Sequence, residues 1–172
     1  MPLSSPSPRK PAHTRKITCA GYQREDGLWD IEGHLVDTKP FALQNKDRGG
    51  RIQPGEPLHE MWVRLTIDDQ LVIQEAEAVT DWAPFNRCAG ATDSFRQLIG
   101  LQIAPGWNRK IRNRIGGING CTHINEMLGQ VATTAIQSLY GVKQEQGTLK
   151  EEEVNMASLH TCYALPGEKK EA

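Results

Sequence analysis

A strict alternation of apolar and polar side chains limits the folds open to this chain more than any other feature. From Met61 to Ile67 every second residue is apolar, and three side chains lie between them: Trp62, Arg64 and Thr66. This period of two is that of a strand with one buried face. Asp68-Asp69-Gln70 then offers a turn, and residues 71–80 return as a second strand. The resulting hairpin needs another layer to cover its apolar face.

Two further strands are predicted before this hairpin. Residues 17–22 form the first strand, and residues 28–38 form the second strand after a turn at Asp26-Gly27. Residues 44–57 are rich in Gly, Pro and charged side chains and are predicted to be a loop. The first half therefore reads as an antiparallel meander of about four strands.

The second half is predicted to be helical. A short helix ends near Ile99 before Gly100, and another follows Pro105 and ends at Gly116-Gly117. The third runs from about Thr122 to Tyr140, with apolar residues three and four apart: Ile124, Met127, Leu128, Val131, Ala135, Ile136 and Leu139. Strands followed by helices indicate an α+β fold, in which about three helices pack on one face of an antiparallel sheet of about four strands.

The ends of the chain differ in composition from its middle. Residues 1–14 carry four prolines and three serines and are predicted to be a disordered basic arm. Residues 15–142 form the α+β domain. Residues 143–172 comprise a charged linker and a C-terminal segment that can dock on the domain.

Composition narrows the classes of partner. The 20 Lys and Arg residues nearly balance 21 Asp and Glu residues, which disfavours nucleic acid as a partner. No apolar run reaches the roughly 18 residues of a membrane span, and the N-terminus lacks the apolar core of a secretory signal. We therefore expect a soluble, cytoplasmic protein with no membrane partner. Homo-oligomer formation remains open.

The segment 114–123 (Arg-Ile-Gly-Gly-Ile-Asn-Gly-Cys-Thr-His) carries the clearest chemistry. Its glycines bring Cys121 and His123 to the start of the third predicted helix. Free N–H groups and the helix dipole there favour a thiolate and disfavour a protonated imidazole. Cys121 and His123 are therefore candidate catalytic residues, as nucleophile and base.

Thiol and imidazole groups elsewhere suggest a metal site. Zinc and iron both accept cysteine and histidine ligands. If separate loops converge on the helix start, four residues can supply the ligands: Cys88, Cys121, His123 and Cys162. No CxxC pair is present, so the spacing alone does not assign the metal.

An acid on an apolar face offers a second constellation. Asp37 shares the face of Trp29, Ile31 and Leu35 at the end of a predicted strand and can act as a general base. His59 opens the following strand and can line the same cleft. A cluster of cations before the glycine loop can hold a small anionic ligand together with that loop, through Arg109, Arg112, Arg114 and Gly120.

Three stretches resemble a bacterial family classed as a domain of unknown function. They begin at Asp26 (Asp-Gly-Leu-Trp-Asp-Ile-Glu-Gly-His-Leu-Val-Asp), at Gly55 (Gly-Glu-Pro-Leu-His-Glu-Met-Trp-Val) and at Gly120 (Gly-Cys-Thr-His-Ile). The resemblance spans about residues 15–165. Tyr163 stands where that family tends to have histidine after the cysteine at position 162. The resemblance implies no particular activity.

The order of elements is also similar to the iron–sulfur scaffold fold of the NifU/SufU type. Those proteins hold zinc or a nascent cluster with three cysteines and an Asp or His. The resemblance implies that Cys88 matches the early ligand and Cys121 the late one. The scaffold's Gly-Cys loop has no counterpart between Ala89 and Gly100, which favours a reworked metal or thiol site on a similar frame.

Three functions remain open from the sequence. The first is a cytoplasmic protein whose Cys/His site binds zinc or iron, with or without catalysis. The second is a metal-free hydrolase, lyase or isomerase acting on a small anionic substrate through Cys121 or His123, with Asp37 or His59 as partner. The third is a non-catalytic accessory module.

Overall fold

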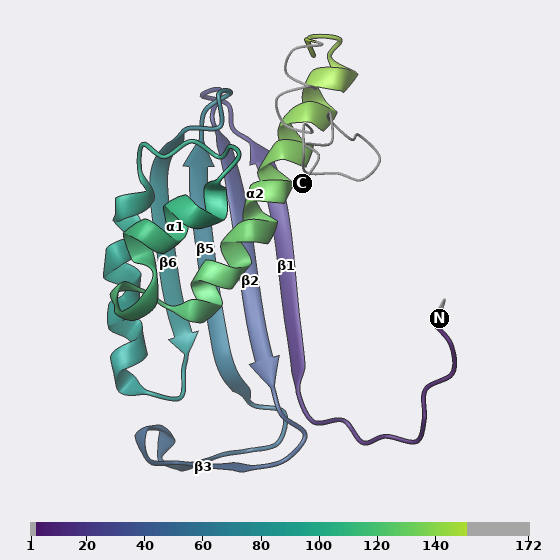
Figure 1. Cartoon of the computed structure of the whole chain (residues 1–172), viewed down its shortest axis with the longest axis vertical. Coiled ribbons are helices and arrows are strands. Elements are labelled where there is room, and N and C mark those ends of the chain that lie inside the picture. The colour runs from purple at the N-terminus through teal and green to yellow at the C-terminus, as the bar shows by residue number, and fades with distance from the viewer. Residues whose placement is uncertain (1–2, 151–172) are drawn as a thin grey trace, which may run out of the picture.

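The computed structural model, which describes residues 3–150, is a sheet covered on one face by helices (Figure 1). Four antiparallel strands form the sheet in the order β1-β2-β5-β6. Their bounds are β1 Thr14–Gln23, β2 Trp29–Thr38, β5 Pro57–Ile67 and β6 Ile73–Trp82. The predicted α+β class, with a four-stranded antiparallel sheet and three helices, is confirmed.

The three longest helices within residues 3–150 are η2 (Asn86–Leu98), α1 (Trp107–Ile115) and α2 (Thr122–Glu145), and a single turn, η3 (Gly117–Asn119), lies between the last two. α2 begins where the sequence predicts and continues past Tyr140. The predicted short helix ending near Ile99 is instead η2, a 3₁₀ helix of 13 residues. Thr92 and Ser94 donate side-chain hydrogen bonds to carbonyls three residues earlier, a spacing that suits a 3₁₀ turn. Within residues 3–150 no helix has the length and apolar character needed to cross a membrane.

Residues 44–57, predicted to be a loop, contain a small hairpin. Strands β3 (Leu43–Asn45) and β4 (Gly50–Ile52) pair around the single turn η1 (Lys46–Arg48). The Asn45 side chain accepts the N–H of Arg48, and Gly49 takes the left-handed conformation that ends the turn. This hairpin joins the end of β2 to the start of β5.

The core lies between the sheet and the helices. Alternate residues of β2 and β5 point into it, and the predicted apolar stripe of α2 packs against them: Ile124, Met127, Leu128, Val131, Ala135 and Leu139 are all buried. The opposite face of the sheet carries Trp62 and a row of charged side chains, including the ion-paired Glu32 and Arg64. The helices therefore cover only one face, as predicted.

Gly33 sets the distance between α2 and the centre of the sheet. A Cβ atom on this residue would lie 2.8 Å from Val131 Cγ2 and 3.0 Å from both Met127 Sδ and Val63 Cγ2. Such contacts leave no room for a side chain in a close-packed interior. The absence of a side chain in the middle of β2 thus lets α2 lie directly on the strand.

Gly33→Val should destabilise the domain by about 1–3 kcal/mol, because it overpacks this contact. Gly141→Ala is the matched control, since a Cβ there meets no atom within 4 Å and alanine favours a helix. Urea unfolding followed by circular dichroism measures both. A Gly33→Val midpoint equal to that of the unmodified protein would contradict the packing.

Candidate metal centre

Strand register builds one polar row at the end of the sheet from which the N-terminal segment leaves (Figure 1). In this row Arg15 of β1 pairs with Asp37 of β2, and Asp37 pairs with His59 of β5. The next row inward is Ile17, Leu35 and Met61. Because neighbours in register share a face, the three polar side chains project toward the helix side of the sheet.

The glycine loop places the fourth side chain over this row. α2 begins at Thr122, directly after Cys121. Gly120 permits the close approach to the end of α1, since a Cβ there would lie 2.1 Å from the carbonyl oxygen of Ile115. The Asn125 side chain donates to that carbonyl at 2.7 Å and holds the two helices together. His123, in the first turn of α2, then reaches the polar row.

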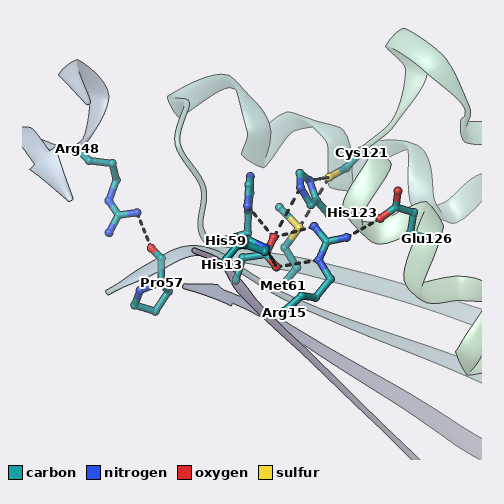
Figure 2. Close-up of polar contacts among 10 residues, drawn as sticks. His13, Arg15, Arg48, Pro57, His59, Met61, Cys121, His123 and Glu126 are labelled. Carbon is teal, nitrogen blue, oxygen red and sulfur yellow. Dashed lines mark hydrogen bonds and ion pairs between the residues drawn. The ribbon is translucent and has the colours of Figure 1, made fainter. Parts of the chain in front are cut away.

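Asp37 is the centre of the group, and Figure 2 labels the side chains that contact it, Arg15, His13, His59 and His123. Only 1% of the Asp37 side chain is exposed. Arg15 donates from Nε to Oδ1 and from Nη2 to Oδ2, both at 2.8 Å. His59 Nδ1 lies 3.1 Å and His123 Nε2 lies 3.8 Å from Oδ2, and His13 Nε2 lies 3.3 Å from Oδ1. Two imidazoles from different elements therefore converge on one carboxylate oxygen.

The surroundings set the charge of each group. Burial raises the pKa of the Asp37 carboxyl, but the hydrogen bonds and charge of Arg15 outweigh this effect and hold the pKa below its ordinary value. The rings of His59 and His123 lie 3.8 Å apart at 31°. Burial and then His123 lower the pKa of His59 to about 4, while burial and then Arg15 lower the pKa of His123. At neutral pH the group is thus a carboxylate beside two neutral imidazoles.

These three side chains fit the demands of a transition-metal ion. Asp37, His59 and His123 each offer one ligand atom, and the three atoms lie within 4.8 Å of one another. A tetrahedral ion with bonds of about 2.1 Å separates its ligand atoms by about 3.4 Å. The 3.1 and 3.8 Å distances to Oδ2 bracket this value. The group could therefore hold a small ion.

Four of the candidate site residues come together here. Asp37, His59 and His123 form the group, and Cys121 Sγ lies 3.8 Å from Nδ1 of His123 and 3.8 Å from Sδ of Met61. The three ligand candidates come from the end of β2, the start of β5 and the start of α2.

The remaining candidates are not among the three grouped side chains. Cys88 belongs to η2 and is outside the three-residue group found in residues 3–150, and Cys162 lies beyond the described residues. The cations of α1 are exposed at three positions: Arg109, Arg112 and Arg114. Arg114 donates to the carbonyl of Gln97 at 2.9 Å. The anion-binding role of these arginines and of Gly120 stays a prediction.

Three residues of the site were not identified from the sequence. Arg15 holds Asp37, Glu126 holds Arg15 at 2.6 Å, and His13 contacts Asp37 from the segment predicted to be a disordered arm. Arg15 precedes Ile17 and Cys19 at intervals of two residues, which places it on the inner face of its strand. This spacing is the feature of the sequence that could have identified Arg15 as a site residue. Its partner could be found only from the register between strands.

The histidines make stability depend on pH. Folding lowers the pKa of His59 from 6.5 to about 4, so between these values the unfolded chain binds more protons than the folded protein. The free energy of unfolding should therefore decrease as the pH falls through this window, by about 3 kcal/mol from His59 alone. Asp37, whose pKa is lowered as well, adds a loss only at still lower pH.

Urea unfolding at a series of pH values, with a chelator present, measures this effect. His59→Asn should flatten the decrease between pH 6.5 and 4, because the variant has no imidazole to protonate at this position. Equal slopes in the two proteins would contradict the assignment.

Comparison with known proteins gives the chain a family. Neither a curated protein nor a solved structure matches it significantly. A family described as "Protein of unknown function (DUF2889)" matches residues 13–137, which include every residue of the polar row and the first turns of α2. The chain therefore belongs to the DUF2889 family, whose description assigns no activity.

Proposed function

We propose that this protein binds one zinc or iron ion through Asp37, His59 and His123. One observation carries the proposal: the imidazoles of His59 and His123 approach the same oxygen of a buried carboxylate, at distances suited to a shared ion. A neutral imidazole offers a lone pair to a cation once its tautomer places the proton on the other ring nitrogen, which for His59 means moving it from Nδ1, the nitrogen bonded to Asp37. The ionised carboxylate supplies the negative charge. The group can therefore accept an ion without first losing a net proton.

The set of donors favours zinc or iron over magnesium or calcium. Two histidines and one carboxylate bind zinc in hydrolytic enzymes and iron(II) in oxygenases, and in both cases positions remain open for water or substrate. Hard ions prefer an all-oxygen environment. The same arrangement thus supports a catalytic as well as a structural ion.

The contacts of Cys121 favour a role other than the direct coordination predicted from the sequence. Its sulfur contacts Nδ1 of His123, whereas Nε2 is the nitrogen near Asp37. A group on the far side of a ligating imidazole fixes the ring orientation and the tautomer. We therefore assign to Cys121 the positioning of His123, rather than direct coordination.

Elemental analysis and equilibrium dialysis with Zn²⁺ or with Fe²⁺ under anaerobic conditions test the site. The unmodified protein should hold about one ion per chain, and His123→Ala should weaken binding by about 100-fold or more, because it removes a ligand atom. Cys88→Ser is the control and should bind as the unmodified protein does, since Cys88 is outside the group. An unmodified protein that binds neither ion would refute the proposal.

A second candidate function rests on the same histidine. Cys121 Sγ is 3.8 Å from Nδ1 of His123, and Nε2 of that ring is 3.8 Å from Asp37. A thiol, an imidazole and a carboxylate in this order are the parts of a nucleophilic cysteine site, in which distances are often longer without substrate. The order supports a metal-free enzyme with Cys121 as nucleophile and His123 as base.

Alkylation of chelator-treated protein distinguishes this candidate. With iodoacetamide at neutral pH, Cys121 should react about 10-fold or more faster than Cys19 and Cys88, and His123→Gln should remove the difference. Mass spectrometry of the peptides gives the separate rates. Equal rates at the three thiols would exclude a nucleophilic Cys121.

A further inference from the structure

The arginine in the site is tied to both of its carboxylates and still faces solvent. Arg15 donates to Asp37 through Nε and Nη2 and to Glu126 of α2 through Nη1. Its side chain remains 31% exposed, and Figure 2 shows its guanidinium directed toward the Glu126 side chain, next to His123. A guanidinium has five N–H donors, and these three bonds use three of them.

The arginine and the proposed ion share one oxygen of Asp37. Nη2 of Arg15 lies 2.8 Å from Oδ2, and both histidines approach this same oxygen. An ion bound there lies beside the guanidinium and competes with it for the electrons of Oδ2. The N–H groups of Nη2 would then need another acceptor, and an anion in an open coordination position of the ion could supply it.

The charges of the site favour a negatively charged ligand. The charged groups that face His123 are Arg15, Asp37, Glu126 and, when protonated, His13. A divalent ion and Arg15 together exceed the two carboxylates by one positive charge, even with His13 neutral. A partly buried site with such an excess favours a negatively charged ligand.

The segment between the two strand ends adds further positive charge. Residues 39–56 connect β2 to β5, so they leave the sheet after Asp37 and return before His59. They carry four cations, Lys39, Lys46, Arg48 and Arg51, against the two acids Asp47 and Glu56. The Arg48 side chain is anchored by the carbonyl of Pro57 at 3.1 Å, two residues before His59. The connection that joins the two ligand-bearing strands therefore carries a net charge of +2.

From these observations we infer that the metal-bound site takes a small oxyanion, a carboxylate or a phosphate, held jointly by the ion and by the guanidinium of Arg15. This inference rests on the proposed metal site and names its class of ligand. The arginine that recognises the anion is then Arg15, at the polar row, rather than the exposed arginines of α1.

Cobalt(II) in place of the native ion gives a direct readout, because its visible absorption changes when a ligand enters its coordination shell. Inorganic phosphate and acetate are titrated separately into the cobalt-loaded protein. At least one of the two anions should shift the spectrum, and the shift should saturate at one anion per chain. The anion that binds more tightly identifies the preferred class of ligand. Arg15→Gln should still bind cobalt but should bind this anion about 10-fold or more weakly. Arg112→Gln, in an exposed arginine of α1, should behave as the unmodified protein.

Arg15→Lys replaces Arg15→Gln in this experiment if circular dichroism shows that Arg15→Gln does not fold. Lysine keeps the positive charge but lacks the planar guanidinium that donates two parallel hydrogen bonds. This variant too should weaken anion binding while retaining cobalt. Equal anion affinity in the unmodified protein and the folded Arg15 variants would overturn the inference while leaving the metal site intact. The inference would also be overturned if neither anion changed the cobalt spectrum. It would be overturned as well if calorimetry showed that the anion binds the metal-free protein as tightly as the metal-loaded protein. Failure of the unmodified protein to bind cobalt, zinc or iron would instead refute the metal site itself, and the inference with it.

Discussion

The burial of one carboxylate organises this end of the molecule. Asp37 occupies an inward position of β2 where the preceding inward residues are apolar, and an ionised side chain at such a position is costly unless charges and hydrogen bonds compensate it. Arg15 on one neighbouring strand and His59 on the other provide this compensation. Leucine would continue the apolar face at lower cost. The polar row is thus costly for stability, and the proposed metal site would explain why this cost is tolerated.

The position of the polar row at the edge of the core lets a polar group form without interrupting the apolar packing. One step further into the sheet, Ile17, Leu35 and Met61 belong to the continuous core beneath α2. At the row itself the helix has just begun, so His123 reaches Asp37 while Arg15 keeps contact with solvent. Burial there is sufficient to lower the pKa values of both histidines, while the side chains of Arg15 and His123 stay partly exposed.

Much of this arrangement follows from local patterns. The alternation in β2 and β5 gave the strands, the apolar spacing gave α2, and the start of α2 at Thr122 follows from the glycines before it. Asp37 stood out because an acid shared an apolar face, and His59 because it opened the next strand. The hairpin within residues 44–57 and the 3₁₀ form of η2 were not found, since both depend on side-chain hydrogen bonds to single backbone groups rather than on a period.

The sequence by itself determined which residues lie on the inner face of each strand and which helix carries a thiol and an imidazole at its start, because these properties depend only on spacing along the chain. It did not determine which inner residues become neighbours. Only strand register placed Arg15 and His59 on either side of Asp37, and only the packing of α2 brought His123 to them while leaving Cys88 outside the group. Contacts between distant segments depend on how whole elements pack, and this information is spread over the entire core.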